Sequence, residues 1–129
     1  MTSPGGARVV HRCYVSHSHA HYGGALVDGA YVLGLFGDAA TELCIQTDGD
    51  EGLFAAYDLV EFRAPVRAGD VVEVTAQVDR AGARSRGIAF EARVVCRAEP
   101  ERSESAAAVL DPAIVAVVAH GTVVVPAAG

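Results

Sequence analysis

Residues 26–44, LVDGAYVLGLFGDAATELC, decide the fold. The stretch contains no proline and is rich in alanine and leucine, a composition that favours an α-helix. Asp28 falls near the first turn, where an acidic side chain suits the positive end of the helix dipole. Gly29, Gly34 and Gly37 each lower the helix propensity by about 1 kcal/mol relative to alanine, which makes sense if another group packs very close to the helix backbone. Because the stretch is apolar on nearly every side, we expect this helix to be buried.

Strand signals precede and follow the helix. Residues 8–16 form a plausible first strand, and further signals lie at 53–64, 71–80, 86–98 and 113–125. Two segments alternate apolar and polar residues, the period of a half-buried strand; their apolar sets are Val72, Val74, Ala76 and Val78, and Ile88, Phe90, Ala92, Val94 and Cys96. This order predicts an α+β fold in which an antiparallel sheet of about five strands wraps around one long buried helix. Because the last strand is apolar on both faces, we expect association through sheet edges or faces.

The composition limits the class of protein. The 129 residues suit a single domain, 1–129, with residues 1–7 as a frayed terminus and 99–111 as a mobile loop. The net charge is −6 and all ten basic residues are arginine, a balance that argues against nucleic-acid binding or association with an anionic membrane. The three cysteines are far apart and form no CxxC motif, which favours reduced thiols. No signal peptide or membrane-length apolar run is seen, so we expect a cytoplasmic protein.

Several motifs, in order, carry a resemblance to a known family. They are AHYGGALVDGA (20–30), LFGDAATEL (35–43), DGDEGLF (48–54), and VEFRAPVRAGD (60–70) followed by FEARVV (90–95). Together they resemble the hotdog-fold 3-aminobutyryl-CoA and β-alanyl-CoA ammonia lyases, from about residue 14 to the final GTVVVP. The resemblance implies a hotdog fold and reversible elimination of ammonia from a short-chain β-amino acyl-CoA. It also implies a site between two subunits and no cofactor beyond the coenzyme A of the substrate.

The same resemblance implies a homodimer and leaves a trimer of dimers open. The partners of such a protein are the acyl-CoA substrate and ammonia. Two other functions fit the fold: an acyl-CoA thioesterase in which Asp38 activates water, and an acyl-CoA-binding protein without catalysis.

Lyase chemistry requires a polarised thioester carbonyl, a base over the α-proton and a place for ammonium. The helix that opens near Val27–Gly29 offers free backbone N–H groups and the positive end of a dipole for the carbonyl. Gly23, Gly24 and Gly29 would let substrate approach the backbone closely. The alternative is a flexible turn whose glycines serve packing.

Asp38 and Glu42 are the candidates for the base. They are spaced i and i+4, so they share one face of an otherwise apolar helix. A carboxylate in apolar surroundings beside a like charge has a raised pKa, which suits proton transfer near neutral pH. We predict Asp38 as the base, with Glu42 as its partner or as an ammonium ligand. The alternative is that arginine partners satisfy both, or that both are exposed.

His21 and Tyr22 directly precede the glycine pair. In the family interpretation they line the thioester pocket, where His21 orients the carboxylate or contacts the amine. Otherwise His21 bonds a backbone carbonyl and Tyr22 belongs to the core. Asp28 is either a substrate-binding residue or simply the negative charge at the start of the helix.

Three histidines at alternate positions, His17, His19 and His21, could supply zinc ligands. Gly23 and Gly24 instead predict a curving loop, and no further cysteine or carboxylate lies at ligand spacing. We therefore predict no native metal. His17 and His19 depart from the family pattern and are expected on an exposed loop.

Coenzyme A carries phosphates, for which the planar guanidinium of arginine is well suited. Arg63 and Arg67 belong to one predicted turn, and Arg80, Arg84 and Arg86 cluster around another. The sequence does not choose among them.

Overall fold

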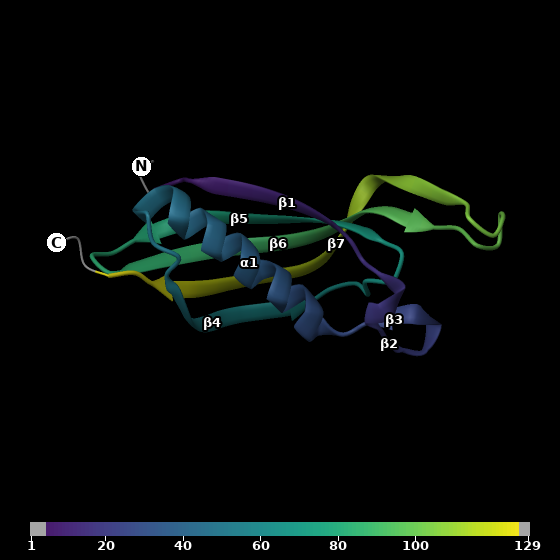
Figure 1. Cartoon of the computed structure of the whole chain (residues 1–129), viewed down its shortest axis with the longest axis horizontal. Coiled ribbons are helices and arrows are strands. Elements are labelled where there is room, and N and C mark those ends of the chain that lie inside the picture. Colours follow the sequence, from purple (N-terminus) through teal and green to yellow (C-terminus); the bar gives the residue numbers. More distant parts are fainter. Residues whose placement is uncertain (1–4, 127–129) are drawn as a thin grey trace.

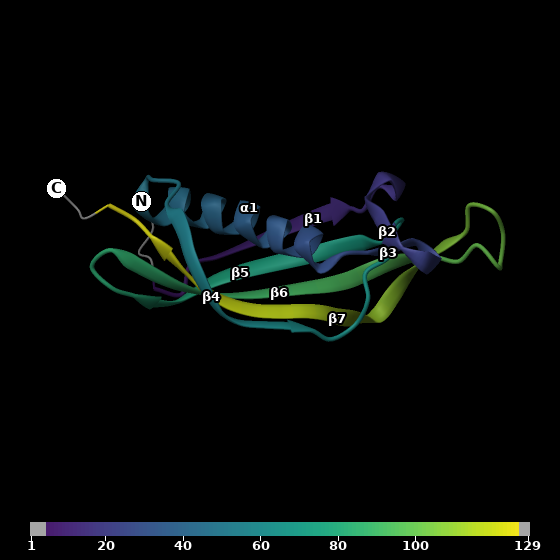
Figure 2. The same cartoon turned by 90° about the horizontal axis from the view of Figure 1, so that it is seen from below.

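The structure, a computed structural model, describes residues 5–126. A five-stranded antiparallel sheet in the order β1-β5-β6-β7-β4 carries one long helix on a single face (Figures 1 and 2). A small two-stranded sheet, β2-β3, lies beside the start of that helix. The elements are β1 (Arg8–Tyr14), η1 (His17–His19), β2 (Ala20–Tyr22), η2 (Gly23–Ala25), β3 (Leu26–Val27), α1 (Gly29–Asp48), β4 (Leu53–Phe62), β5 (Val71–Ala81), β6 (Ser85–Ala98) and β7 (Ala107–Val124). Of the predicted frayed segment 1–7, residues 1–4 lie outside the described residues.

The helix α1 begins and ends at residues suited to those positions. The Asp28 carboxylate accepts a hydrogen bond from the backbone N–H of Tyr31 at 3.1 Å, so Asp28 is the N-cap rather than part of the first turn. At the other end Gly49 has a φ of 67°, and its N–H donates to the carbonyl of Ile45. The helix therefore starts later and ends later than the predicted 26–44, because Leu26–Val27 are used as strand β3.

The core lies between α1 and the sheet. Phe36 is fully buried and its ring stacks on that of Phe90, with centroids 5.0 Å apart. The predicted alternation in 71–80 is confirmed, and in 86–98 it holds from Ile88 to Val94, whereas Cys96 is only partly buried. The predicted all-round burial of the helix is wrong: a single sheet covers one side of α1 and leaves the other exposed.

An ion pair fixes the carboxyl end of α1 to β6. Arg86 donates to both carboxylate oxygens of Asp48, at 2.5 and 3.1 Å, and both side chains are largely buried. The hydrogen bond from Arg86 lowers the pKa of Asp48 below its usual value. Arg86 is therefore a structural residue and not available to bind a phosphate.

The hairpin of β6 and β7 extends well past the ends of the other strands (Figure 1). Strand β7 already begins at Ala107, inside the segment predicted as a loop over 99–111. The reason is the register: Arg97 pairs with Ala108 and Cys96 with Val109. The connecting loop is therefore confined to 99–106.

On the sheet face away from α1, His120 lies between two carboxylates. Its Nδ1 is 2.6 Å from an oxygen of Asp58 and its Nε2 is 2.9 Å from an oxygen of Asp79. The hydrogen bonds to Asp58 and Asp79 raise the pKa of His120, and the bond to His120 lowers the pKa of Asp58. This cluster connects β4, β7 and β5 across the outer face.

Candidate active site

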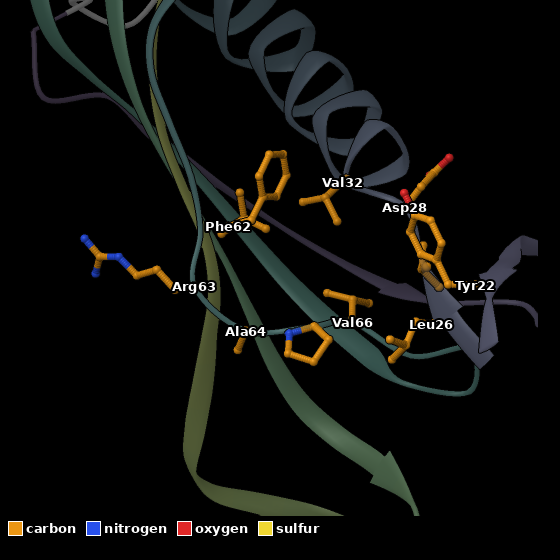
Figure 3. A pocket seen from close by; sticks show the side chains of 12 residues that line it. Tyr22, Leu26, Asp28, Val32, Phe62, Arg63, Ala64 and Val66 are labelled. Atoms are coloured by element: carbon orange, nitrogen blue, oxygen red, sulfur yellow. The ribbon is translucent and has the colours of Figure 1, made fainter. Parts of the chain in front are cut away.

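A cavity of about 430 Å³ opens at the amino end of α1 (Figure 3). Its wall combines the start of the helix, the small sheet, the end of β4 and the segment that follows β4. The lining residues are Tyr22, Leu26, Val27, Asp28, Gly29, Val32, Phe62, Arg63, Ala64, Pro65, Val66 and Val117. Most of these side chains are apolar, as in sites that take small organic ligands.

Main-chain hydrogen bonds build one wall of this cavity. The N–H of Val27 donates to the carbonyl of Val66 at 2.9 Å, and the N–H of Ala68 donates to the carbonyl of Ala25 at 2.8 Å. Leu26 and Arg67 form an isolated β-bridge between these two bonds. Residues 25–27 are thus held against residues 66–68, which fixes the start of α1 relative to the end of β4.

The amino end of α1 offers hydrogen-bond donors to this cavity. The first N–H groups of a helix have no carbonyl one turn earlier to which they can donate. The Asp28 carboxylate accepts from the N–H of Tyr31, and the N–H groups of Gly29 and Ala30 remain without a partner within the helix. The ring of Phe62 packs directly over Gly29, where any side chain would overlap it. Gly29 is therefore confirmed as a close-approach position, whereas open space surrounds Gly34 and Gly37. A thioester oxygen placed here would meet free donors and a positive helix dipole.

Three predicted residues come together beside these donors. His21 Nδ1 lies 3.9 Å from an oxygen of Asp28, and the His21 ring meets Tyr22 edge-on with centroids 4.6 Å apart. His21 is 59% exposed in its side chain and Tyr22 is 56% exposed. Tyr22 thus lines the cavity and is not a core residue.

Gly23 and Gly24 do not line this cavity. Gly24 has a φ of 71°, which lets the chain reverse between β2 and β3, and it lies at a second cavity at the base of the β6–β7 hairpin. Their contribution here is to the turn, and their role in substrate binding stays a prediction.

Asp38 and Glu42 lie on the exposed side of α1, away from this cavity. At a rise of about 1.5 Å per residue, Asp38 is about 14 Å along the helix from Gly29. Glu42 accepts a hydrogen bond from the Gln46 amide at 2.6 Å, and its other oxygen is 2.7 Å from His11 Nε2. The predicted apolar surroundings are wrong for the single chain, because both side chains are exposed on the flank of α1 that lies beside the edge strand β1.

The other two histidines diverge from His21. Residues 17–19 form a short 3₁₀ turn rather than an extended strand, so the alternate spacing does not gather the three imidazoles. His19 packs on Tyr31 with centroids 4.4 Å apart, and His17 lies at the second cavity. Within residues 5–126, no three histidine, cysteine or carboxylate side chains are placed to hold a metal ion.

Tyr31 and Cys13 form a further polar contact between α1 and β1. The Tyr31 hydroxyl is 3.3 Å from Cys13 Sγ. Burial, together with this contact, raises the pKa of Tyr31 to about 12, so the phenol stays neutral at physiological pH.

The fold and the cavity together define a hotdog protein, and the comparisons agree. A sequence model of the thioesterase superfamily matches residues 24–88, half of the chain. The chain belongs to this superfamily.

Within the superfamily, the likeness to the ammonia lyases is confirmed. The chain is 55% identical to a 3-aminobutyryl-CoA ammonia lyase from Acetoanaerobium sticklandii, over 87% of this chain and 89% of that protein. Its fold matches the β-alanyl-CoA:ammonia lyase from Clostridium propionicum with a TM-score of 0.88 and 34% identity, covering 94% of this chain and 86% of that one. An acyl-CoA hydrolase from Staphylococcus aureus, at 18% identity and a TM-score of 0.73, covers 96% of this chain and 66% of that one and shares the fold. Among residues 5–126, no helix is long and apolar enough to cross a membrane.

Two parts of the site were missing from the sequence prediction. Phe62 and the segment 63–66 form a wall of the cavity, although the sequence indicated only a strand end and a turn there. The signal was present in VEFRAPVRAGD, where an aromatic residue directly precedes a proline-containing connection. Which partner that connection meets depends on residues far away in the chain.

Proposed function

We propose that this protein is a 3-aminobutyryl-CoA ammonia lyase, which interconverts 3-aminobutyryl-CoA with crotonyl-CoA and ammonia. The observation that carries the proposal is the 55% identity to a lyase of that name over nearly the full length of both chains. The cavity at the amino end of α1 supports it with free N–H donors for a thioester oxygen.

In this proposal the thioester carbonyl accepts hydrogen bonds from the N–H groups of Gly29 and Ala30. As the base removes the α-proton, negative charge develops on the carbonyl oxygen, and the positive end of α1 stabilises that charge. The electron pair of the broken C–H bond forms the α–β double bond. The Cβ–N bond breaks, and its electron pair leaves with nitrogen as ammonia.

The base that we propose is Asp38 of a second copy of the chain. A base must come within about 3 Å of the proton it removes, and about 14 Å of helix separates Asp38 from Gly29 of the same chain. Two antiparallel helices from two copies would bring the middle of one α1 to the amino end of the other. Open space at Gly34 and Gly37 leaves room for such an approach.

We propose that the two copies join along β4. This strand lies at one edge of the sheet and exposes Leu53, Leu59 and Phe62. An unpaired edge with exposed apolar side chains is suited to pairing with another chain. Phe62 also lines the cavity, so the edge and the site adjoin.

Asp28 is the proposed ligand for the amine. One of its oxygens caps α1 through Tyr31, and the other has no hydrogen-bond partner among residues 5–126 and lies 3.9 Å from His21 Nδ1 at the margin of the cavity. A carboxylate there would hold the substrate ammonium near Gly29, where the thioester binds. This assigns to Asp28 the ammonium role that the sequence suggested for Glu42, whose oxygens are occupied by His11 and Gln46.

The apolar wall of the cavity favours a methyl group on the substrate. Leu26, Val32 and Val66 form this part of the lining. Burial of one methyl group contributes about 0.8 kcal/mol, so we expect about a fourfold preference for 3-aminobutyryl-CoA over β-alanyl-CoA.

Incubation of the purified protein with crotonyl-CoA and ammonium tests the proposal. A lyase removes the enoyl absorbance and retains the thioester. Release of free thiol would indicate a thioesterase, and coenzyme A binding without turnover would indicate a binding protein. Asp38→Asn should abolish turnover, whereas Glu51→Gln, which changes an exposed carboxylate in the turn after α1, should not. Full lyase turnover by Asp38→Asn would remove Asp38 from the mechanism.

A further inference from the structure

Phe62 differs from the other phenylalanines of the chain in where its ring lies. The rings of Phe36 and Phe54 both stack on that of Phe90 in the core, with centroids 5.0 and 5.9 Å away. Phe62 is instead 58% exposed, and within residues 5–126 its ring stacks on no other aromatic ring. It stands at the last position of β4 and lines the cavity at the amino end of α1. The packing of the core therefore does not explain this large side chain.

The strand pairing directs the Phe62 side chain toward α1. Phe62 pairs with Val117, so the two side chains lie on the same face of the sheet. Val117 is buried, which identifies that face as the one that α1 covers. Directly after Phe62, the N–H groups of Arg63 and Ala64 both donate to the carbonyl of Ala116, at 2.7 and 3.1 Å. The backbone that carries the ring is thus fixed, and only the side chain can turn.

The ring of Phe62 packs against the backbone at the start of α1. Figure 3 shows the ring extending from the end of β4 toward the helix. A Cβ atom at position 29 would overlap Cε1 and Cζ of this ring, so the space that the ring occupies is the space that Gly29 leaves open. The ring therefore borders the end of the helix whose N–H groups are proposed to bind the thioester carbonyl.

A buried ion pair holds the wall of the cavity that contains Val66. Nε and Nη2 of Arg97 donate to the two oxygens of Asp70 at 3.0 and 2.9 Å, and Asp70 is fully buried. Nη2 of Arg97 also donates to the carbonyl of Pro65 at 3.0 Å, and Asp70 accepts from the N–H of Arg67 at 2.8 Å. The residues on both sides of Val66 are thus fixed. A longer acyl chain cannot push this wall outward without breaking these bonds.

We propose that Phe62 determines the longest acyl chain that the cavity accepts. This inference rests on the proposed function and narrows its substrate class. A carbonyl oxygen bonded to the N–H of Gly29 lies about 2.9 Å from that nitrogen, so the acyl carbons begin beside the ring that covers Gly29. The four carbons of a crotonyl group fit between the ring and the apolar lining. Further methylene groups meet the ring, because the wall at Val66 does not move.

The test compares crotonyl-CoA with 2-hexenoyl-CoA, which has two more methylene groups, in the addition of ammonium. Phe62→Ala removes the ring and lets both methylene groups become buried. The ratio of kcat/KM for 2-hexenoyl-CoA to kcat/KM for crotonyl-CoA should therefore rise about fifteenfold, or about fourfold for each methylene group. Phe62→Leu keeps an apolar side chain at the end of β4 and should raise the same ratio by a smaller factor.

Leu59→Ala is the matched control for these variants. It removes an exposed apolar side chain from the same edge strand, but Leu59 pairs with His120, on the sheet face away from the cavity. This variant should leave the ratio unchanged. Circular dichroism and sedimentation establish that each variant is folded and in the same oligomeric state as the wild type. An unchanged ratio in Phe62→Ala and Phe62→Leu, or an equal rise in Leu59→Ala, would overturn the inference.

Calorimetric binding of butyryl-CoA and hexanoyl-CoA gives a readout that does not depend on turnover, because neither has a double bond to accept ammonia. Phe62→Ala should strengthen the binding of hexanoyl-CoA relative to butyryl-CoA by about fifteenfold. If crotonyl-CoA does not react with ammonium but this change in relative affinity is seen, the proposed lyase function fails while the role of Phe62 stands. If crotonyl-CoA reacts and the relative affinity is the same in the wild type and Phe62→Ala, the role of Phe62 fails alone.

Discussion

A mixture of two inactive variants should regain activity if each site uses two chains. Asp38→Asn removes the proposed base, and Gly29→Leu places a side chain where Phe62 lies and where the thioester is proposed to bind. In a dimer that contains one copy of each variant, one site combines the intact helix end of the first chain with the intact Asp38 of the second. The other site carries both changes.

The expected size of the effect follows from the geometry. About 14 Å of helix between Gly29 and Asp38 prevents one chain from supplying both groups to one substrate. A heterodimer isolated by two different affinity tags therefore contains one intact site out of two. We expect about half of the wild-type kcat per dimer, with KM unchanged.

The assay is loss of enoyl absorbance from crotonyl-CoA in ammonium buffer. Each homodimeric variant must first be shown to be folded and inactive, and a tagged wild-type dimer gives the reference rate. A heterodimer as inactive as its parents would refute the assignment of the base to a second chain. It would mean that Asp38 acts on a substrate held elsewhere along its own helix.

Three further predictions concern stability. Arg86→Leu leaves the buried Asp48 carboxylate without its partner, so urea unfolding should show a free energy of unfolding lower by about 3–5 kcal/mol. The double variant Asp48→Leu/Arg86→Leu removes both charges and should lose less of this free energy than Arg86→Leu alone. Phe36→Ala removes a fully buried ring stacked on the sheet and should cost about 3–5 kcal/mol in the same measurement, whereas smaller losses would mean that the helix packs loosely. The pKa of His120 is higher in the folded protein than in the unfolded chain, where it is near 6.5. The protonated His120 therefore stabilises the fold fully below pH 6.5, and this stabilisation is lost as the pH rises through the folded pKa. His120→Gln should flatten the dependence of the unfolding free energy on pH between these two pKa values.

The sequence predicts the elements well where one physical signal dominates. The apolar, proline-free stretch gives the helix, and the alternation from Val72 to Val78 gives the buried face of β5. The same apolar stretch could not show which side of the helix the sheet covers, because a helix that is apolar all round has no preferred face. For this reason Asp38 was expected among apolar neighbours and is found exposed.

The candidate site was predictable in part. His21, Tyr22, Asp28 and Gly29 are neighbours in the sequence, so local geometry alone brings them together. The wall formed by 63–66 and the position of Arg97 depend on pairing between segments about forty and thirty residues apart, which no local pattern records. Such long-range contacts decide both cavities.

The main-chain bonds between residues 25–27 and 66–68 have a consequence for how the acyl specificity can change. Because backbone groups hold this wall in place, its frame does not depend on the identity of the side chains that line it. Leu26 and Val66, whose backbone belongs to this frame, can therefore be exchanged for apolar residues of similar volume at a modest cost in stability. Within such a frame, we expect single substitutions to change the preferred acyl chain, while the amino end of α1, the proposed thioester site, stays unaltered.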